Sequence, residues 1–324
     1  MAKYNLSKKT RVSNLLICIL YHDVKTDLLS LIKNINLNKN ISILIVVDGK
    51  KKIKNKELIL KLNKRIKFLY SLQKKTVAHN RNLGLLHAKN KFDTILYIDS
   101  DVIPEKKIAN YHLNFHSKNK LISIIGGPVI PSFFKNNFNI WEVLDGCLSW
   151  FTSIKPNFKR NIDRPYHLPT CNLSIKMNFL IDNQIFFDEK LETGEDVDLC
   201  NKVREKNGKI MLINKAKVYH QDRKNFKDFF NHHAKWGRHQ YYTLYKKKFF
   251  HLTGRIIFYS FFLIFYPIFM PIINLISTLL TIFPWVKSNI KFIFLLLPTY
   301  IVHLIKGFFT YFEFLKDLMN TKNK

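Results

Sequence analysis

The stretch that decides the fold is Thr94-Ile95-Leu96-Tyr97-Ile98-Asp99-Ser100-Asp101, an apolar run that ends in two acids. The run predicts a buried β-strand. Because alternate side chains of an extended chain share a face, Asp99 and Asp101 can both meet one cation. Their hard oxygen ligands favour Mg²⁺ or Mn²⁺, which would suit the site to neutralising a diphosphate. When such a motif stands alone after a strand, however, its two acids more commonly lie in a solvated loop and bind no metal.

Outward from this strand, apolar segments alternate with amphipathic ones over about residues 12 to 213. The expected strands are Leu15–Leu20, Ile41–Val47 and Ile66–Leu69, and the expected helices are Thr26–Ile35, Glu57–Asn63 and Val77–Ala88, the last with Thr76 as N-cap. The alternation predicts a Rossmann-like α/β domain whose mainly parallel sheet has helices on both faces. Ligands of such sheets bind beyond the carboxyl ends of the strands, so Asp48 and Asp99 are expected at one edge.

The stretch from Gly126 to Pro169 is less regular and contains two tryptophans, Trp141 and Trp150. We expect loops and short helices there, lying over the edge of the sheet. An acceptor molecule could bind in this region.

A second acidic cluster, Gly194-Glu195-Asp196-Val197-Asp198, opens a helix that is predicted to run to about Lys206. The apolar stripe of this helix consists of Leu199, Cys200 and Val203. Asp196 falls on the same stripe by the 3.6-residue spacing, and a carboxylate there is costly unless it is paired or functional. Alternatively, Asp196 is a first-turn acid stabilised by the helix dipole, with Thr193 as N-cap. Beside a bound diphosphate, such a carboxylate could accept a proton from an incoming hydroxyl.

The composition indicates an anionic partner. The net charge is +30, from 53 basic and 23 acidic residues, which suits membrane lipid, nucleotide phosphates or nucleic acid. Richness in Lys, Asn and Ile, typical of an AT-rich genome, accounts for part of this excess. The aromatic residues gather in the C-terminal apolar segment, which argues against nucleic acid as a partner. Four scattered cysteines without a C-x-x-C pair indicate neither a zinc site nor a disulfide framework.

The character of the chain changes at Arg255. Residues 256–285 carry no charged side chain, and residues 290–312 are interrupted only by Lys291, His303 and Lys306. A membrane helix needs about 20 apolar residues, so both runs are long enough. Pro267 and Pro271 split the first run, so a kinked span or a re-entrant hairpin is as plausible as a straight helix. The remaining alternative is a pair of buried core helices.

Basic residues precede the apolar tail, at Lys246-Lys247-Lys248 and Arg255. Positive charge marks the cytoplasmic side of membrane helices, so the bulk of the chain is expected at the cytoplasmic face of the cell (inner) membrane. We therefore expect a catalytic domain over residues 1–245 and a basic juxtamembrane segment with a membrane anchor over residues 246–324. Two full spans would return the end of the chain to the cytoplasmic side.

Four blocks in a fixed order carry a resemblance to a known family. They are Ile43–Gly49, Ala78–Gly84, Leu96–Asp101, and Phe187-Asp188-Glu189 followed by Gly194–Leu199. Over about residues 12 to 220, the chain resembles an inverting family 2 glycosyltransferase of the GT-A fold. The resemblance implies a nucleotide-sugar donor, a divalent metal ion (Mg²⁺ or Mn²⁺) and inversion at the anomeric carbon.

The resemblance also implies roles for the donor-binding residues. Asp48 would bind the base or ribose of the nucleotide, Arg81 would lie near its phosphates, and Asp99 would contact the ribose or donor sugar. The family's strand often ends Asp-Asp-Gly-Ser, whereas this chain has Val47 and Lys50 at the first and last of these positions. The Gln-x-x-Arg-Trp pattern of processive synthases is absent near Trp236, so processive synthesis is not expected.

By the same resemblance, Asp101 would ligate the metal with help from Asp99, and Asp196 would be the catalytic base. His220 would reach the metal or the diphosphate, or would be a structural histidine. Three strands precede the Asp99-Ser100-Asp101 motif. This position argues against a phosphatase of the haloacid dehalogenase type, in which the motif ends the first strand of the domain.

The sequence therefore predicts a metal-dependent inverting glycosyltransferase that acts on a hydroxyl of a lipid-linked or cell-surface glycan. Two alternatives stay open. The acceptor could be a polyprenyl phosphate, which is already anionic and needs the base less. The chain could also be a basic protein that binds a membrane surface without catalysis.

Overall fold

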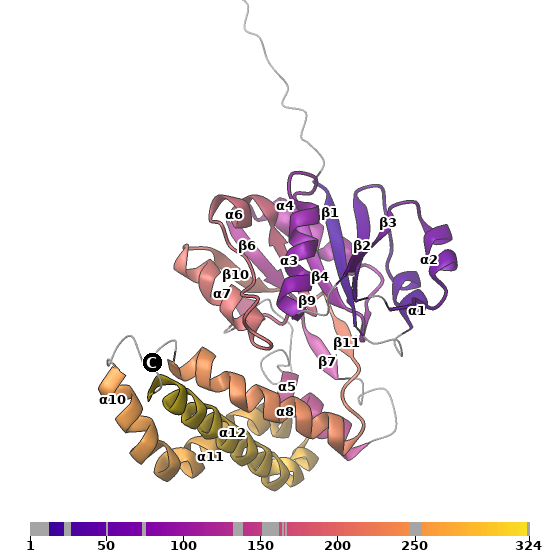
Figure 1. Ribbon diagram of the computed structural model, residues 1–324. Coiled ribbons are helices and arrows are strands. Elements are labelled where there is room, and N and C mark those ends of the chain that lie inside the picture. The colour runs from indigo at the N-terminus through magenta and orange to yellow at the C-terminus, as the bar shows by residue number, and fades with distance from the viewer. Residues whose placement is uncertain are drawn as a thin grey trace, which may run out of the picture.

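The structure is a computed structural model that describes residues 13–22, 27–49, 51–72, 76–131, 139–150, 162–163, 165, 167–246 and 255–322. An α/β layer lies above a layer of long helices, and the chain passes from one to the other at α8 (Phe226–Gln240) (Figure 1). Thr26, Lys247 and Lys248, which entered the sequence predictions, lie outside the described residues.

The described residues form a main sheet of eight strands. These strands are β1 (Leu15–Tyr21), β2 (Ile41–Asp48), β3 (Ile66–Ser71), β4 (Thr94–Asp99), β6 (Ile122–Gly126), β8 (Ile162–Asp163), β9 (Asn172–Lys176) and β10 (Lys209–Leu212). Their order is β3-β2-β1-β4-β9-β6-β10-β8. Strands β3, β2, β1 and β4 are parallel, as are β6 and β10, whereas β9 and β8 are antiparallel to their neighbours. The prediction of a mainly parallel sheet is confirmed.

Helices cover both faces of this sheet, which explains why every residue of β1 is buried. One face carries α1 (Leu28–Lys33), α2 (Lys56–Leu62) and α4 (Ile108–Lys118), and the other carries α3 (Val77–Ala88), α6 (Met177–Asp182) and α7 (Glu195–Glu205). Alternate residues of β1 point into the two cores. Ile17 packs with the first group of helices, and Cys18 packs with the second.

A small second sheet lies at the carboxyl edge of the first. It consists of β5 (Val102–Pro104), β7 (Val129–Pro131) and β11 (Val218–His220), in the order β5-β11-β7. Strand β11 is antiparallel to β5 and parallel to β7. The sequence did not reveal this sheet, because its strands have only three residues each and form through long-range pairing.

The stretch expected as loops and short helices is more regular than predicted. It holds β7, β9 begins just after it, and α5 (Ile140–Trp150) is a largely buried helix of 11 residues. Its apolar residues, among them Val143 and Cys147, pack against the C-terminal helices. The helix that was predicted to begin near Gly194 is confirmed as α7, and the N-cap predicted at Thr76 is also confirmed.

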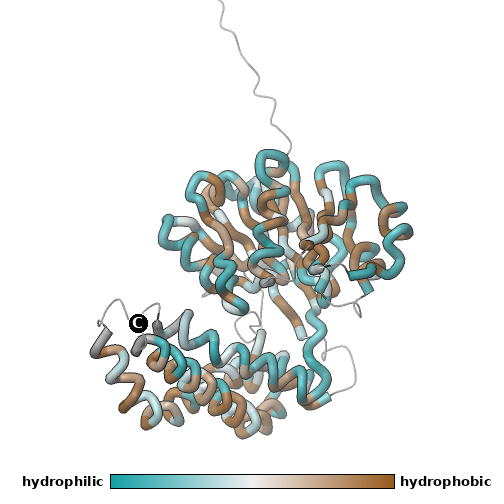
Figure 2. The backbone as a smooth tube through the Cα atoms, viewed as in Figure 1, coloured by the Kyte–Doolittle hydropathy of each residue, from teal (hydrophilic) through white to brown (hydrophobic). Residues whose placement is uncertain are grey.

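The lower layer contains α5, α8 and the C-terminal helices. After α8 come η2 (Tyr241–Lys246, π-helical), α10 (Arg255–Ser260), η3 (Phe261–Phe265, π-helical), α11 (Tyr266–Ser288), η4 (Ile290–Leu295, a 3-10 helix) and α12 (Leu296–Lys322). Within the described residues, two stretches are long and apolar enough to cross a membrane by length and composition, Ile257–Ser288 and Ile290–Asn320. Figure 2 shows hydrophilic residues along α8 and mostly hydrophobic ones along α11.

Candidate active site

The carboxyl edge of the main sheet brings two predicted acids into one row. Leu20 of β1 pairs with Val46 on one side and with Asp99 on the other. Asp48 ends β2 and is buried, with its Oδ2 2.9 Å from His22 Nδ1 and 3.6 Å from Lys51 Nζ. The expectation that Asp48 and Asp99 share an edge is therefore confirmed.

The start of α3 connects these two acids. Thr76 caps the helix by accepting a hydrogen bond from the backbone N–H of His79, which orients the first turn. Asn80 Nδ2 then donates to Asp48 Oδ1 over 3.5 Å, and Arg81 Nη2 donates to Asp99 Oδ1 over 3.2 Å. Neighbouring residues of one helix thus contact the ends of two different strands.

Arg81 is the electrostatic centre of the site. Its side chain is only 3% exposed and bonds to Asp99 from β4 and, through Nη1, to Glu195 from α7. The Tyr97 hydroxyl donates to the Arg81 carbonyl oxygen over 3.0 Å. Glu195 was not among the predicted site residues. Its position beside Asp196 in the acidic cluster was the available signal, but its contact with Arg81 depends on how α7 packs.

We expect Arg81→Met to lower the free energy of unfolding by about 3 kcal/mol, because it leaves the Glu195 and Asp99 carboxylates without their cation. Urea unfolding in mild detergent measures the loss. Adding Glu195→Gln should recover part of it, since one uncompensated charge is then removed. Arg65→Met, at a half-buried arginine that bonds to Asn63, should cost less than about 1 kcal/mol. A similarly small loss for Arg81→Met would contradict the role assigned to this ion-pair cluster.

Asp101 meets His220 because of strand pairing. His220 in β11 pairs with Val102 in β5, the residue that directly follows Asp101, and the backbone N–H of Gln221 donates to the Asp101 carbonyl oxygen. His220 Nε2 consequently lies 3.5 Å from Asp101 Oδ2. Residues far apart in the sequence are thus adjacent at the sheet edge.

The other side of His220 is held by a buried acid. Its Nδ1 lies 3.0 Å from Asp222 Oδ1, which also accepts a hydrogen bond from the Trp150 indole N–H over 2.7 Å. Burial alone would lower the pKa of His220, but the carboxylates of Asp101 and Asp222 outweigh it and raise the pKa to about 9. Asp222 and Trp150 fix the imidazole so that Nε2 faces Asp101. Asp222 was not predicted as part of the site.

The residues present fit a divalent cation at Asp101. Its Oδ1 atom is buried and has no hydrogen-bond partner among the described residues. His220, with Nδ1 fixed by a carboxylate, has the arrangement found in metal-ligating histidines. Within the part of the chain that the structure describes, no group of three or more His, Cys, Asp or Glu side chains forms a complete metal cluster. Bound diphosphate oxygens would have to supply further ligands.

The structure separates Asp99 from Asp101 more than the sequence indicated. Strand β4 ends at Asp99, and Ser100 and Asp101 form a turn, so the extended backbone expected across the motif is not found. Asp99 is directed to Arg81 and Asp101 to His220. A shared cation at Asp99 and Asp101 stays a prediction.

Asp196 lies in the first turn of α7 and is half-buried. The helix begins after Gly194, whose φ of 75° suits glycine, so Gly194 and not Thr193 is the N-cap. The predicted apolar stripe is confirmed for Leu199, Cys200 and Val203. The buried carboxylates of this helix are Glu195 and Asp198, whereas Asp196 is partly open to solvent. The 3.6-residue spacing therefore did not predict the burial of Asp196, which lies in the first turn of α7.

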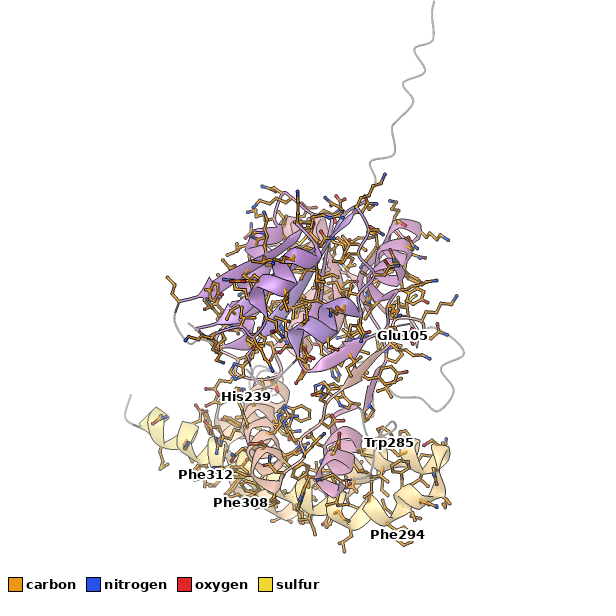
Figure 3. The ribbon with its side chains drawn as sticks, turned by 90° about the vertical axis from the view of Figure 1, so that its right-hand side faces the viewer. Glu105, His239, Trp285, Phe294, Phe308 and Phe312 are labelled. Carbon is orange, nitrogen blue, oxygen red and sulfur yellow. The ribbon has the colours of Figure 1, made fainter. Side chains whose placement is uncertain are left out.

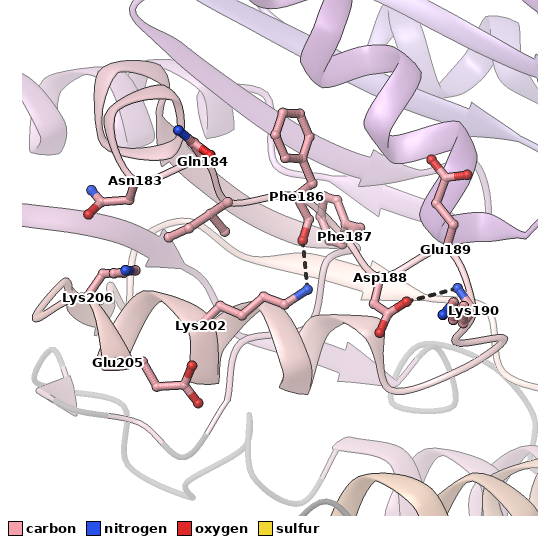
Figure 4. Close-up of a pocket in the computed structure, with 11 residues that line it drawn as sticks. Asn183, Gln184, Phe186, Phe187, Asp188, Glu189, Lys190, Lys202, Glu205 and Lys206 are labelled. Carbon is pink, nitrogen blue, oxygen red and sulfur yellow. Dashed lines mark hydrogen bonds between the residues drawn. The ribbon is translucent and has the colours of Figure 1, made fainter.

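A hollow of about 520 Å³ lies beside α7 (Figure 4). Its lining includes Asp188, Lys190, Lys202, Glu205 and the Phe186 carbonyl oxygen, which accepts a hydrogen bond from Lys202 Nζ. None of the predicted site residues lines it. We assign the site to the side chains at the sheet edge, because they carry the paired charges and the Asp101 oxygen that lacks a partner within the described part of the chain.

The mixed, mainly parallel sheet with helices on both faces is a fold of the GT-A type. The family model of glycosyl transferase family 2 matches residues 17–182, about half of the chain. The chain belongs to this family, whose enzymes transfer a sugar from a nucleotide-sugar. No curated protein matches the chain.

Solved structures support the same fold. A crystal structure of S. aureus TarS, residues 1–349, has a TM-score of 0.51 and 12% identity, covering 85% of this chain and 88% of that one. The same TarS segment in complex with UDP-GlcNAc has a TM-score of 0.51, 13% identity and the same coverage. GalNAc-T7, solved with UDP, GalNAc and Mn²⁺, has a TM-score of 0.51 and 16% identity; the match covers 66% of this chain and 45% of GalNAc-T7, less than half its length. At these identities the likeness concerns the fold alone.

Proposed function

We propose that the protein is a metal-dependent, inverting glycosyltransferase that moves a sugar to a hydroxyl of a lipid-linked or cell-surface glycan. The observation that carries this proposal is the contact of Arg81 with Asp99 on one side and Glu195 on the other. Arg81 joins the end of β4, where a diphosphate would lie, to the first turn of α7, where Asp196 lies. Asp99 and Glu195, the residue next to the candidate base, are thereby held on opposite sides of one cation.

In the proposed reaction, the bond between the anomeric carbon and the diphosphate oxygen breaks as the acceptor oxygen attacks from the opposite face. Asp196 takes the proton of the acceptor hydroxyl, and Arg81 lies close to the phosphates. Asp101 and His220 would hold Mg²⁺ or Mn²⁺, which supplies charge neutralisation for the departing nucleoside diphosphate. Asp48, buried between His22 and Asn80, would orient the base or ribose.

The nucleotide of the donor can be identified by thermal stability. Screening UDP-, GDP- and CMP-sugars with Mn²⁺ should single out one nucleotide class that raises Tm. UDP-sugars are the first choice because the TarS complex contains UDP-GlcNAc. A ligand at about 100 times its Kd stabilises by about 2.7 kcal/mol, which is a shift of several degrees. Chelation of the metal should abolish the shift. If no nucleotide-sugar raises Tm, with or without metal, the proposed donor site is wrong.

We also propose that the C-terminal helices attach the protein to a membrane, with the catalytic domain on the cytoplasmic side. The two long apolar stretches are mainly exposed: in the most apolar 18 residues of each, only 17% and 33% are buried. Buried core helices of a soluble domain would be mainly enclosed. The boundary near residue 245 stays a prediction, since α8 lies before it and packs against α12, which lies after it.

A polyprenyl phosphate acceptor stays the alternative within the same enzyme class. Its attacking oxygen is already anionic, so replacing Asp196 would have little effect on transfer. The binding protein without catalysis is disfavoured by membership of the transferase family.

A further inference from the structure

We propose that helices α10 to α12 lie along one face of a lipid membrane, within a single leaflet, and do not cross it. This inference rests on the membrane attachment proposed above and decides between two spans and other arrangements. Three observations carry it: the outward apolar surface, the polar helix α8 beside α12, and the attachment of both ends of the hairpin to the catalytic side.

Helix α11 has its polar side inside and its apolar side outside. Its buried side includes Asn274, Thr278 and Thr281. The outward side chains, each 45% to 65% exposed, are Ile268, Phe269, Ile272, Leu275, Ile276, Leu279, Leu280 and Phe283. This arrangement is the reverse of a helix on a water-soluble domain. A continuous apolar surface of this size requires a hydrocarbon partner.

Helix α12 continues this surface along one stripe. The stripe consists of the exposed residues Leu297, Ile301, Phe308, Phe312 and Met319. Figure 3 shows Phe294, Phe308 and Phe312 on the helices farthest from the sheet. The opposite side of α12 contacts α8, where the Thr310 hydroxyl donates to the Gly237 carbonyl oxygen over 2.7 Å. A Cβ at Gly237 would lie 2.5 Å from the Lys306 carbonyl oxygen, so the two backbones approach closely.

The polar side of α8 is incompatible with a membrane span at this place. Its exposed side chains include Lys227, Asp228, Asn231 and Arg238, and Lys235 pairs with Glu192 of the catalytic domain over 3.3 Å. These residues are spread along nearly the whole of α8, which has 15 residues and is therefore about 22 Å long. If α12 crossed a bilayer, α8 beside it would carry these charges into the hydrocarbon, which is strongly disfavoured.

The turn of the hairpin is attached to the catalytic domain. The indole N–H of Trp285, near the end of α11, donates to the Cys147 carbonyl oxygen of α5 over 3.1 Å. Ile282 and Leu295 join the same apolar cluster, together with Leu144 of α5. Figure 3 shows Trp285 next to α5. In a pair of spans, this turn would lie about 30 Å away across the hydrocarbon, out of reach of α5.

The other end of the hairpin is also attached to the catalytic side. The Tyr241 hydroxyl, at the start of η2, donates to Asp317 Oδ2 over 2.6 Å, and Phe258 and Phe314 pack in the same cluster. Exposed lysines lie near both ends of the apolar surface, with Lys287 and Lys291 at the turn and Lys316 toward the end of α12. Together with the net charge of +30, they favour a leaflet with anionic headgroups.

Cysteine accessibility in sealed vesicles of anionic lipid tests the inference. The native cysteines Cys18, Cys147, Cys171 and Cys200 are all buried, so added ones can be read individually. Ser288→Cys places a thiol at the exposed turn, and Lys61→Cys reports the side of the catalytic domain. With the full chain and a membrane-impermeant maleimide, we expect both variants to be labelled to the same extent before the vesicles are opened. Labelling of Ser288→Cys only after permeabilisation, or only after detergent dissolves the bilayer, would overturn the inference.

Vesicle flotation separates this result from membrane attachment itself. Leu279→Glu, at a leucine 50% exposed on α11, should lower the vesicle-bound fraction several-fold. Leu58→Glu, at a leucine 51% exposed on α2, is the matched control and should float like the unaltered chain. If the unaltered chain does not float, the proposed attachment fails. If it floats but its turn is protected, only the single-leaflet arrangement fails.

Discussion

Asp196→Asn is expected to lower kcat for transfer by about 10² to 10⁴, because the amide cannot accept the proton of the acceptor hydroxyl. The side chain is half-buried in the first turn of α7 and keeps its shape in this variant, so the fold should be unaffected. The affinity for the nucleotide-sugar should also be unchanged, since Arg81 bonds to the neighbouring Glu195. The measurement is single-turnover transfer from the donor identified by thermal shift.

The matched control is Glu205→Gln, an exposed acid at the other end of the same helix, which should transfer at the normal rate. The outcome also discriminates between acceptors. A large loss in Asp196→Asn favours a sugar hydroxyl, whereas a rate close to normal indicates an acceptor that is already anionic, such as a polyprenyl phosphate. Reduced donor affinity would instead assign Asp196 to the donor site.

Asp101→Ala should weaken donor binding in the presence of Mn²⁺ by at least about tenfold, to the level seen when the metal is chelated. The reason is the buried Oδ1 of Asp101 next to His220, an oxygen that has no hydrogen-bond partner among the described residues. Isothermal titration with the nucleotide-sugar, with and without Mn²⁺, measures both affinities. In the variant the two affinities should be equal.

Glu57→Ala serves as the control, since this exposed acid lies on α2, a helix that supplies none of the side chains assigned to the site. Donor affinity in Asp101→Ala that still depends on Mn²⁺ as in the unaltered chain would refute the metal assignment. His220→Gln should cause a smaller loss if His220 is a ligand and none if it is only structural. Circular dichroism of each variant confirms that the fold is retained.

Some parts of the site could be predicted because they depend on local sequence. The run Thr94–Ile98 is apolar and continuous, and the edge where Asp48 and Asp99 meet follows from the parallel order of strands. Other parts depend on long-range packing. The contact of Asp101 with His220 requires the pairing of β5 with β11, and neither three-residue strand has a recognisable pattern of its own.

The sequence by itself determined the class of fold, the family and the two long apolar segments, because hydrophobic periodicity and ordered motifs are local properties of the chain. Only the tertiary structure decided that Asp99 pairs with Arg81 while Asp101 meets His220, and that Glu195 completes the ion-pair cluster. It also decided how the apolar helices are arranged. Hydropathy measures how apolar a helix is, whereas its orientation to a membrane depends on its neighbours, here α5 and α8.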